Sequence, residues 1–161
     1  MKIHNVSNTK GASLVELVIA SLIFSIFIVG VTTSYISIMR FEHDVRMKGQ
    51  AINLAREGLE AVYTLYITDW ITIGATNETT DYQVQATSGT WELVTIGYDM
   101  GDYTRVINFE NAFRDADGNI SDTGTEDPET KRITVTISWD NLGSPSTFSL
   151  TMLLADWKNS T

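Results

Sequence analysis

The longest hydrophobic pattern in the chain is an apolar run close to its N-terminus. From Leu17 to Met39 there are 23 residues without any Asp, Glu, Lys or Arg, and sixteen of them are apolar. A helix of that length can cross a hydrocarbon layer about 30 Å thick. The run is longer than the apolar core of a secretory signal, which holds roughly 7–15 residues. The pattern therefore predicts a membrane-length helix over residues 12–39.

After Met39 the apolar positions narrow to a single helical face. The recurring positions have the spacing of one side of a helix. They are Val45, Ile52, Ala55, Leu59, Val62 and Tyr66. This pattern predicts that an amphipathic segment, residues 40–66, continues the first helix to a total length of about 80 Å. Gly49 and Gly58 each cost about 1 kcal/mol relative to alanine, so we expect them at bends or at close approaches.

The second part of the chain, residues 67–161, follows a period of two. Its clearest case is the alternation of Ile133, Val135, Ile137 and Trp139 with hydroxyl-bearing residues, which marks a sheet with one buried and one solvated face. Similar stretches lie at 81–87, 90–98, 103–110, 131–139 and 147–157 and are separated by Gly, Asp, Asn and Ser. The sequence thus predicts an α+β fold, in which four or five antiparallel strands pack one face against the helical stripe.

The negative charge of the chain is concentrated in this second part. The formal net charge is −9, and residues 67–161 carry fifteen acidic and five basic side chains. Such a balance disfavours nucleic acid as a partner, because binding to phosphates requires Lys and Arg. The chain has no cysteine, which excludes disulfides and thiolate metal sites. Lys2 and Lys10, with no acidic residue ahead of Gly11, predict a cytoplasmic N-terminus and an outward-facing acidic part.

Glu16 stands at the entrance of the apolar run, where a carboxylate is costly unless it has a partner. One partner is local, since Ser13 and Glu16 fit a capping box in which Glu16 reaches back to the amide of Ser13. The other requires a cut after Gly11, which would leave a free amine on Ala12, one helical turn before Glu16. That amine could neutralise the carboxylate within one chain or between neighbouring chains.

The stretch Gly11-Ala12-Ser13-Leu14-Val15-Glu16, after a short basic leader and before an apolar helix, resembles the class III signal of type IV prepilins and type II secretion pseudopilins. The resemblance implies cleavage by a prepilin peptidase after Gly11, N-methylation of Ala12, and a role for Glu16 in subunit assembly. Ala12 departs from the phenylalanine that is common at this position. The family's fold, a long N-terminal helix packed on an antiparallel β-sheet head, agrees with the α+β expectation.

The resemblance also implies a domain plan and partners. The plan is a cleaved leader (1–11), a transmembrane and filament-core helix (12–39), the amphipathic half of that helix (40–66) and an acidic globular head (67–161). The partners would be copies of the chain or related pilins, a prepilin peptidase, a platform protein and an assembly ATPase. The chain would begin as a single-pass protein of the cytoplasmic membrane and end in an extracellular type IV pilus. The alternatives are a periplasmic type II secretion pseudopilus and an uncut membrane-anchored binding protein.

One stretch of the acidic part has the spacing of a calcium loop. Counted from Asp115, oxygen ligands fall at the first, third, fifth and twelfth positions, at Asp115, Asp117, Asn119 and Glu126. The sixth position holds Ile120 in place of the required glycine, which favours a plain solvated turn. Both histidines, His4 and His43, precede this part of the chain, so no histidine is available there as a base or a metal ligand, and we expect neither an enzyme nor a cofactor.

Overall fold

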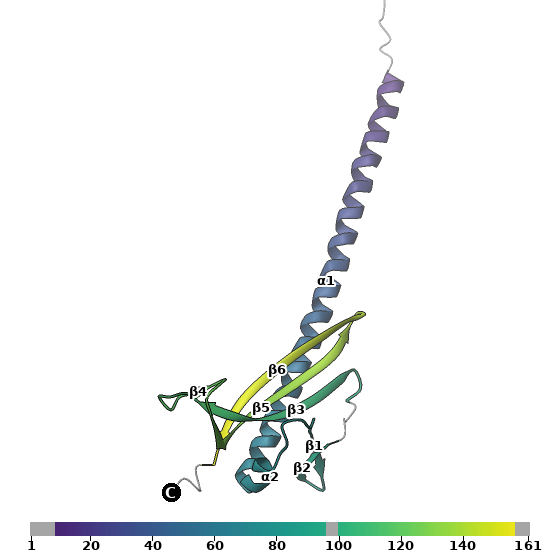
Figure 1. Cartoon of the computed structure of the whole chain (residues 1–161). Helices are drawn as coiled ribbons and strands as arrows, with labels where there is room; N and C mark the ends of the chain where they lie inside the picture. Colours follow the sequence, from purple (N-terminus) through teal and green to yellow (C-terminus); the bar gives the residue numbers. More distant parts are fainter. Residues whose placement is uncertain (1–8, 96–99, 157–161) are drawn as a thin grey trace, which may run out of the picture. The chain divides into compact units, whose positions relative to one another are not determined.

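A computed structural model describes the backbone of residues 9–95 and 100–156, with side chains from Ser13 onwards (Figure 1). These described residues form two helices, α1 (Thr9–Thr68) and α2 (Trp70–Gly74). Six strands follow: β1 (Gln83–Thr87), β2 (Thr90–Val94), β3 (Tyr103–Arg114), β4 (Ile120–Ser121), β5 (Thr125–Asn141) and β6 (Ser144–Ala155). The chain divides into two compact units, one ending at Val45 and the other beginning at Arg46. The division lies inside α1, so the second unit includes most of the amphipathic segment of the helix.

The predicted long helix is confirmed, but it begins earlier than the sequence suggests. α1 starts at Thr9 and passes through Gly11, which places Ser13 in the second turn. Ser13 is therefore not an N-cap, and the capping box of Ser13 and Glu16 is wrong for the described chain. No proline interrupts the stretch ahead of the apolar run, so the helix propagates through a single glycine at a cost of about 1 kcal/mol.

The strands of the second unit form two antiparallel sheets. The larger has the order β4-β3-β5-β6, and β3, β5 and β6 lie side by side in Figure 1. The smaller is the β1–β2 hairpin, tied to β3 by a bridge between Tyr82 and Ile107. Two hairpins close with two-residue loops in the left-handed region, Ser88-Gly89 and Leu142-Gly143. Such loops match the twist of the flanking strands, which fixes the register of β1 on β2 and of β5 on β6.

The buried face of the large sheet is the one that the alternation predicts. Ile133, Val135 and Ile137 are fully buried and Trp139 is 7% exposed. They share one core with the Arg46–Thr68 half of α1, where the Tyr103 hydroxyl on β3 donates to the Met47 carbonyl at 3.1 Å. The α+β architecture, with the long helix packed on antiparallel strands, is therefore confirmed.

The helical stripe is only partly as predicted. Ala55 and Val62 are buried, Ile52, Leu59 and Tyr66 are half-buried, and Val45 is 52% exposed. The remaining buried positions of this half are Met47, Ala51, Gly58 and Ala61. The stripe is centred on small residues because the helix lies close to the sheet, where larger side chains would not fit. A count of large apolar residues alone therefore places the face slightly off its true position.

Gly58 marks the close approach that the sequence led us to expect. A Cβ atom at this position would lie 3.1 Å from the Arg105 Cδ atom and 3.1 Å from a methyl carbon of Val135, which is tighter than ordinary van der Waals contact. A Cβ atom at Gly49 would have no neighbour within 4 Å. Of Gly49 and Gly58, only Gly58 is therefore required by packing.

Gly58→Leu is expected to lower the free energy of unfolding by about 1–3 kcal/mol, because it forces extra carbons into a filled interface. Gly49→Ala is the control and should raise this free energy by up to about 1 kcal/mol, since alanine favours the helix. Denaturation of the full chain in detergent, followed by tryptophan fluorescence, measures both. Equal stability of Gly58→Leu and the parent would show that the helix does not approach the sheet this closely.

Candidate functional site

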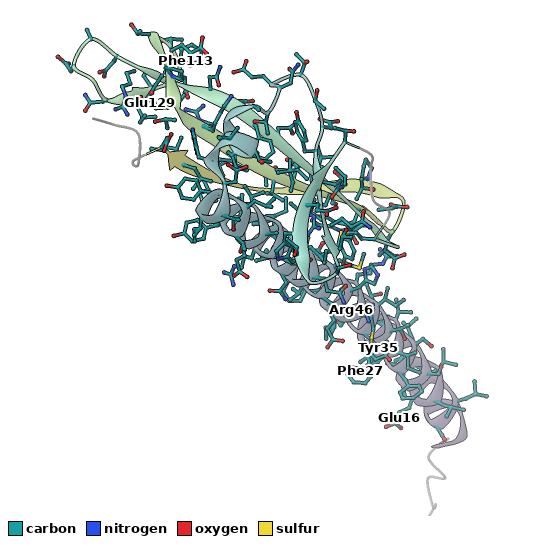
Figure 2. All side chains as sticks on the ribbon, turned by 90° about the horizontal axis from the view of Figure 1, so that it is seen from below. Glu16, Phe27, Tyr35, Arg46, Phe113 and Glu129 are labelled. Atoms are coloured by element: carbon teal, nitrogen blue, oxygen red, sulfur yellow. The ribbon has the colours of Figure 1, made fainter. Side chains whose placement is uncertain are left out.

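The first half of α1 carries a continuous apolar surface. Eighteen large apolar side chains between Leu14 and Phe41 are 45–70% exposed. Figure 2 shows Phe27 and Tyr35 standing out from the helix in this stretch. This helix is long and apolar enough to cross a membrane. Soluble monomers seldom expose more than a few hundred Å² of contiguous apolar surface, so this one requires lipid or protein around it.

Five serine and threonine hydroxyl groups of this stretch are hydrogen-bonded within the helix. The side chains of Ser25, Thr32, Thr33, Ser34 and Ser37 each donate to the carbonyl four residues earlier, at 2.7–3.0 Å. Each side chain has its hydrogen atom engaged locally, which allows it to face hydrocarbon without an unpaired donor. The helix remains continuous through these positions. The hydroxyls are therefore compatible with an apolar environment on all sides.

Glu16 is the exception in this apolar surface. It is exposed, and no hydrogen bond or ion pair joins it to another residue of the described chain. Figure 2 shows its carboxylate at the end of the helix, pointing outwards. The helix places Ala12 one turn earlier, about 6 Å along the axis. The geometry thus brings Ala12 and Glu16 near one another, and the cleavage that would create an amine on Ala12 stays a prediction.

The calcium candidates are placed around the β3–β4 turn. The Asp115 carboxylate accepts hydrogen bonds from the backbone N–H of Asp117 at 3.0 Å and of Asn119 at 2.8 Å. These bonds, that of Asn119 foremost, hold the pKa of Asp115 below its usual range. Glu126 lies in β5 and is hydrogen-bonded to the side chain of Asn111. Within the described ranges, no three His, Cys, Asp or Glu side chains gather as a metal-binding group. Asp115, Asp117 and Asn119 form a turn, and Glu126 lies in the first part of β5.

The acidic residues next to Glu126, Asp127 and Glu129, lie in the first part of strand β5. Asp127 lies in β5 and its side chain is only 13% exposed. It accepts from Arg114 Nε at 2.7 Å, from the Thr130 hydroxyl at 2.8 Å and from the Glu129 N–H at 3.0 Å. Burial alone would raise the pKa of Asp127, but the hydrogen bonds from Thr130, Arg114 and Glu129 outweigh it and the pKa is lowered. The hydrogen bond from Arg114 to Asp127 therefore joins β3 to β5.

The lowered pKa of Asp127 makes the stability of the fold depend on pH in a defined direction. A carboxyl group whose pKa is lower in the folded chain stabilises it above the unfolded value, about 3.9 for Asp, and loses this contribution as pH falls through the folded pKa. Asp127→Asn should lower the free energy of unfolding at pH 7 by about 1.5–3 kcal/mol, the size of a lost hydrogen bond to a charged group. It should also flatten the decline in stability from pH 5 to lower pH.

Urea denaturation of the parent and variant across about pH 2–7 measures both effects. Asp117→Asn is the matched control, because its side chain is exposed in the turn. If the stability curves of Asp127→Asn and the parent run parallel below pH 5, Asp127 does not contribute to acid sensitivity.

Arg105 is a structural residue that the sequence reasoning missed. It lies near the start of β3, on the buried face of the strand, and is 2% exposed. Its guanidinium donates to the Val84 carbonyl at 3.1 Å, the Gln83 side chain at 3.3 Å and the Leu54 carbonyl at 3.3 Å. It also pairs with Glu57 at 3.4 Å. Arg105 therefore joins α1, β1 and β3 at one point.

The sequence contains a pattern that predicts the burial of Arg105. The alternation of Tyr103, Ile107 and Phe109 puts residue 105 on the same inward face, so the register alone places an arginine in the core. A buried guanidinium needs several acceptors, and β1 and the helix supply them here.

No family model, no curated protein and no solved structure matches this chain.

Proposed function

We propose that this chain is a structural subunit of a type IV pilus, a prepilin cut after Gly11, N-methylated at Ala12 and assembled into an extracellular filament. The observation that carries the proposal is the exposed Glu16, which has no partner among the described residues and stands near the start of an exposed apolar helix. A permanent anchor gains nothing from a carboxylate at this position. A subunit that must recognise the charged N-terminus of a neighbour benefits from a carboxylate there, because the two charges attract.

The apolar half of α1 suits two environments in succession. In the membrane its side chains face lipid, and in a filament the same side chains would be buried against other copies. The transfer exchanges one apolar environment for another, so it exposes little hydrophobic surface to water. The acidic second unit has a core of its own and would remain in water throughout.

The proposed subunit would require several partners. A prepilin peptidase would cut and methylate the chain at the cytoplasmic membrane, and a platform protein and an assembly ATPase would drive extraction of the subunit. Further copies of the chain, or related pilins, would surround the helix in the filament. These partners come from the resemblance of residues 11–16 to the prepilin signal, and the charge and apolar surface of α1 are consistent with them.

Mass spectrometry of the N-terminus, combined with shearing of surface filaments, tests the proposal. We expect a chain that begins at N-methylated Ala12 and sheared filaments that contain it. Gly11→Leu is the control and should leave the leader attached, because the cutting signal includes this glycine. An intact leader on the parent chain in membranes would exclude both pilus and pseudopilus. Correct processing without surface filaments would assign the chain to a pseudopilus instead.

A further inference from the structure

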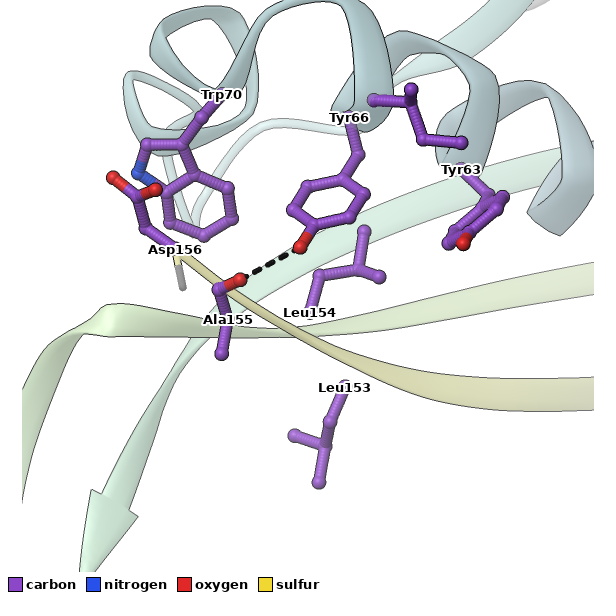
Figure 3. A pocket seen from close by; sticks show the side chains of 8 residues that line it. Tyr63, Tyr66, Trp70, Leu153, Leu154, Ala155 and Asp156 are labelled. Carbon is purple, nitrogen blue, oxygen red and sulfur yellow. Dashed lines mark hydrogen bonds between the residues drawn. The ribbon is translucent and has the colours of Figure 1, made fainter. Parts of the chain in front are cut away.

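The second unit contains an aromatic pocket that the filament proposal does not use. It lies where the end of α1, the start of α2 and the end of β6 meet, and has a volume of about 390 Å³ (Figure 3). Its walls include the rings of Tyr63, Tyr66 and Trp70, together with Leu153 and Asp156. A volume in this range suits a small ligand or a single inserted side chain.

The three rings are set at angles to one another. They occupy positions three and four residues apart, which places them on one side of the helical segments. The centroids of Tyr63 and Tyr66 are 5.8 Å apart with an interplanar angle of 37°, and those of Tyr66 and Trp70 are 5.8 Å apart at 83°. The rings therefore form two nearly perpendicular walls. A flat sugar or aromatic ligand prefers one open ring face, whereas a rounded group can contact two such walls at once.

The central ring is held in place before any ligand arrives. The Tyr66 hydroxyl donates to the Ala155 carbonyl at 2.8 Å, the dashed line in Figure 3. The edge of one ring meets the face of the other in the Tyr66–Trp70 pair, an arrangement that aromatic rings favour. A pocket whose walls are already ordered loses little conformational entropy when a ligand binds.

The charge of the pocket favours a cation. Asp156 contributes a carboxylate to the lining and is only 6% exposed. None of the described residues that line the pocket is basic. Aromatic faces carry negative partial charge and attract cations within about 6 Å of the ring centroid. The aromatic rings and the carboxylate thus both favour the binding of a cation.

We propose that this pocket binds a quaternary ammonium group. The trimethylammonium group is round, apolar on its surface and positively charged, which matches perpendicular aromatic walls beside a carboxylate. A primary ammonium such as that of lysine is more strongly hydrated and would lose more on entering an apolar pocket. All the residues concerned belong to the unit that begins at Arg46, so the proposal is independent of filament assembly.

The first test compares choline with its neutral carbon isostere, dimethylbutanol, on the full chain in a maltoside detergent, which has no cationic headgroup. Fluorescence titration at constant ionic strength should give a dissociation constant for choline on the order of 1 mM. The isostere has the same shape without the charge and should bind at least about tenfold more weakly. Equal binding of the two compounds, or no binding of choline, would overturn the proposal.

Variants place the binding in this pocket. Tyr63 is 47% exposed, so Tyr63→Leu should fold normally and weaken choline binding by about fivefold or more. Tyr63→Phe is the matched control and should bind choline as the parent does, because it keeps the ring. Unchanged choline affinity in Tyr63→Leu would place the binding elsewhere and contradict the assignment.

Asp156→Asn should also weaken choline while leaving dimethylbutanol unaffected. Titration of phosphocholine and of a trimethyllysine amide then separates the sources of the group. Tighter binding of phosphocholine would indicate a lipid or surface-polymer headgroup, tighter binding of trimethyllysine amide would indicate a modified protein, and tightest binding of choline would indicate a free metabolite.

Discussion

Arg105→Ala is expected to lower the free energy of unfolding of the second unit by about 3–5 kcal/mol, the range for breaking a buried charged network. The truncation leaves a cavity between α1 and the sheet, next to the close approach at Gly58. It also removes the donor from the Val84 carbonyl and from the Gln83 side chain, both of which are buried. The cost of an unsatisfied buried acceptor, about 1–3 kcal/mol, is part of this range.

Glu57 contributes little to this cost, because its side chain is 47% exposed and water can replace the arginine. Arg105→Met fills most of the cavity while leaving the acceptors unpaired, so it should cost less than Arg105→Ala. The difference between the two variants measures the packing part of the effect. Denaturant titration of the full chain in detergent gives both values.

Arg132→Ala is the matched control for Arg105→Ala. Arg132 pairs with Asp122 at 2.9 Å, but their side chains are 27% and 88% exposed. Pairs of this kind contribute about 0–1 kcal/mol. A loss at Arg105 no larger than that at Arg132 would mean that the buried guanidinium does not hold α1, β1 and β3 together.

The elements that the sequence predicts well are those with a long, regular period. α1 follows from an unbroken apolar run and a helical stripe, and β5 follows from the alternation that ends at Trp139. β4 and the first residues of β5 were missed because Ile120–Ser121 is short and the stretch from Thr125 is polar. These strands form through pairing with β3, which local pattern cannot reveal.

The candidate sites also differ in how far the sequence alone reveals them. Glu16 is visible in the sequence because a lone carboxylate stands out in an apolar run. The rings of Tyr63, Tyr66 and Trp70 have a regular spacing, yet their pocket depends on Asp156, some ninety residues away in the sequence. Spacing also suggested ligands at Asp115 and Glu126, whereas the fold assigns the first to a turn and the second to a strand. Long-range pairing decides which polar residues meet.

The largest expected functional effect is at Glu16. If the proposed cut frees an amine on Ala12, the amine of one subunit and the carboxylate of its neighbour would form an ion pair inside an apolar filament core. Close charged pairs at protein interfaces couple by about 1.5–7 kcal/mol. Loss of even the smallest of these values corresponds to about a tenfold change in an equilibrium constant.

Glu16→Gln should therefore be cut and methylated normally but yield at least about tenfold fewer filaments than the parent. The amide keeps the size of the side chain and its hydrogen-bonding oxygen, so the loss would report on charge rather than on packing. Sheared filament yield, normalised to the processed chain found by N-terminal mass spectrometry, measures the effect.

Glu42→Gln is the matched control for Glu16→Gln, because Glu42 is also an exposed carboxylate on the same helix, just beyond the apolar surface. Its yield should equal that of the parent, since an exposed charge retains its hydration and requires no partner. A normal yield from Glu16→Gln would remove the assembly role from this residue. Equal losses in both variants would mean that acidic charge along α1 matters in general, and that no specific pair with Ala12 forms.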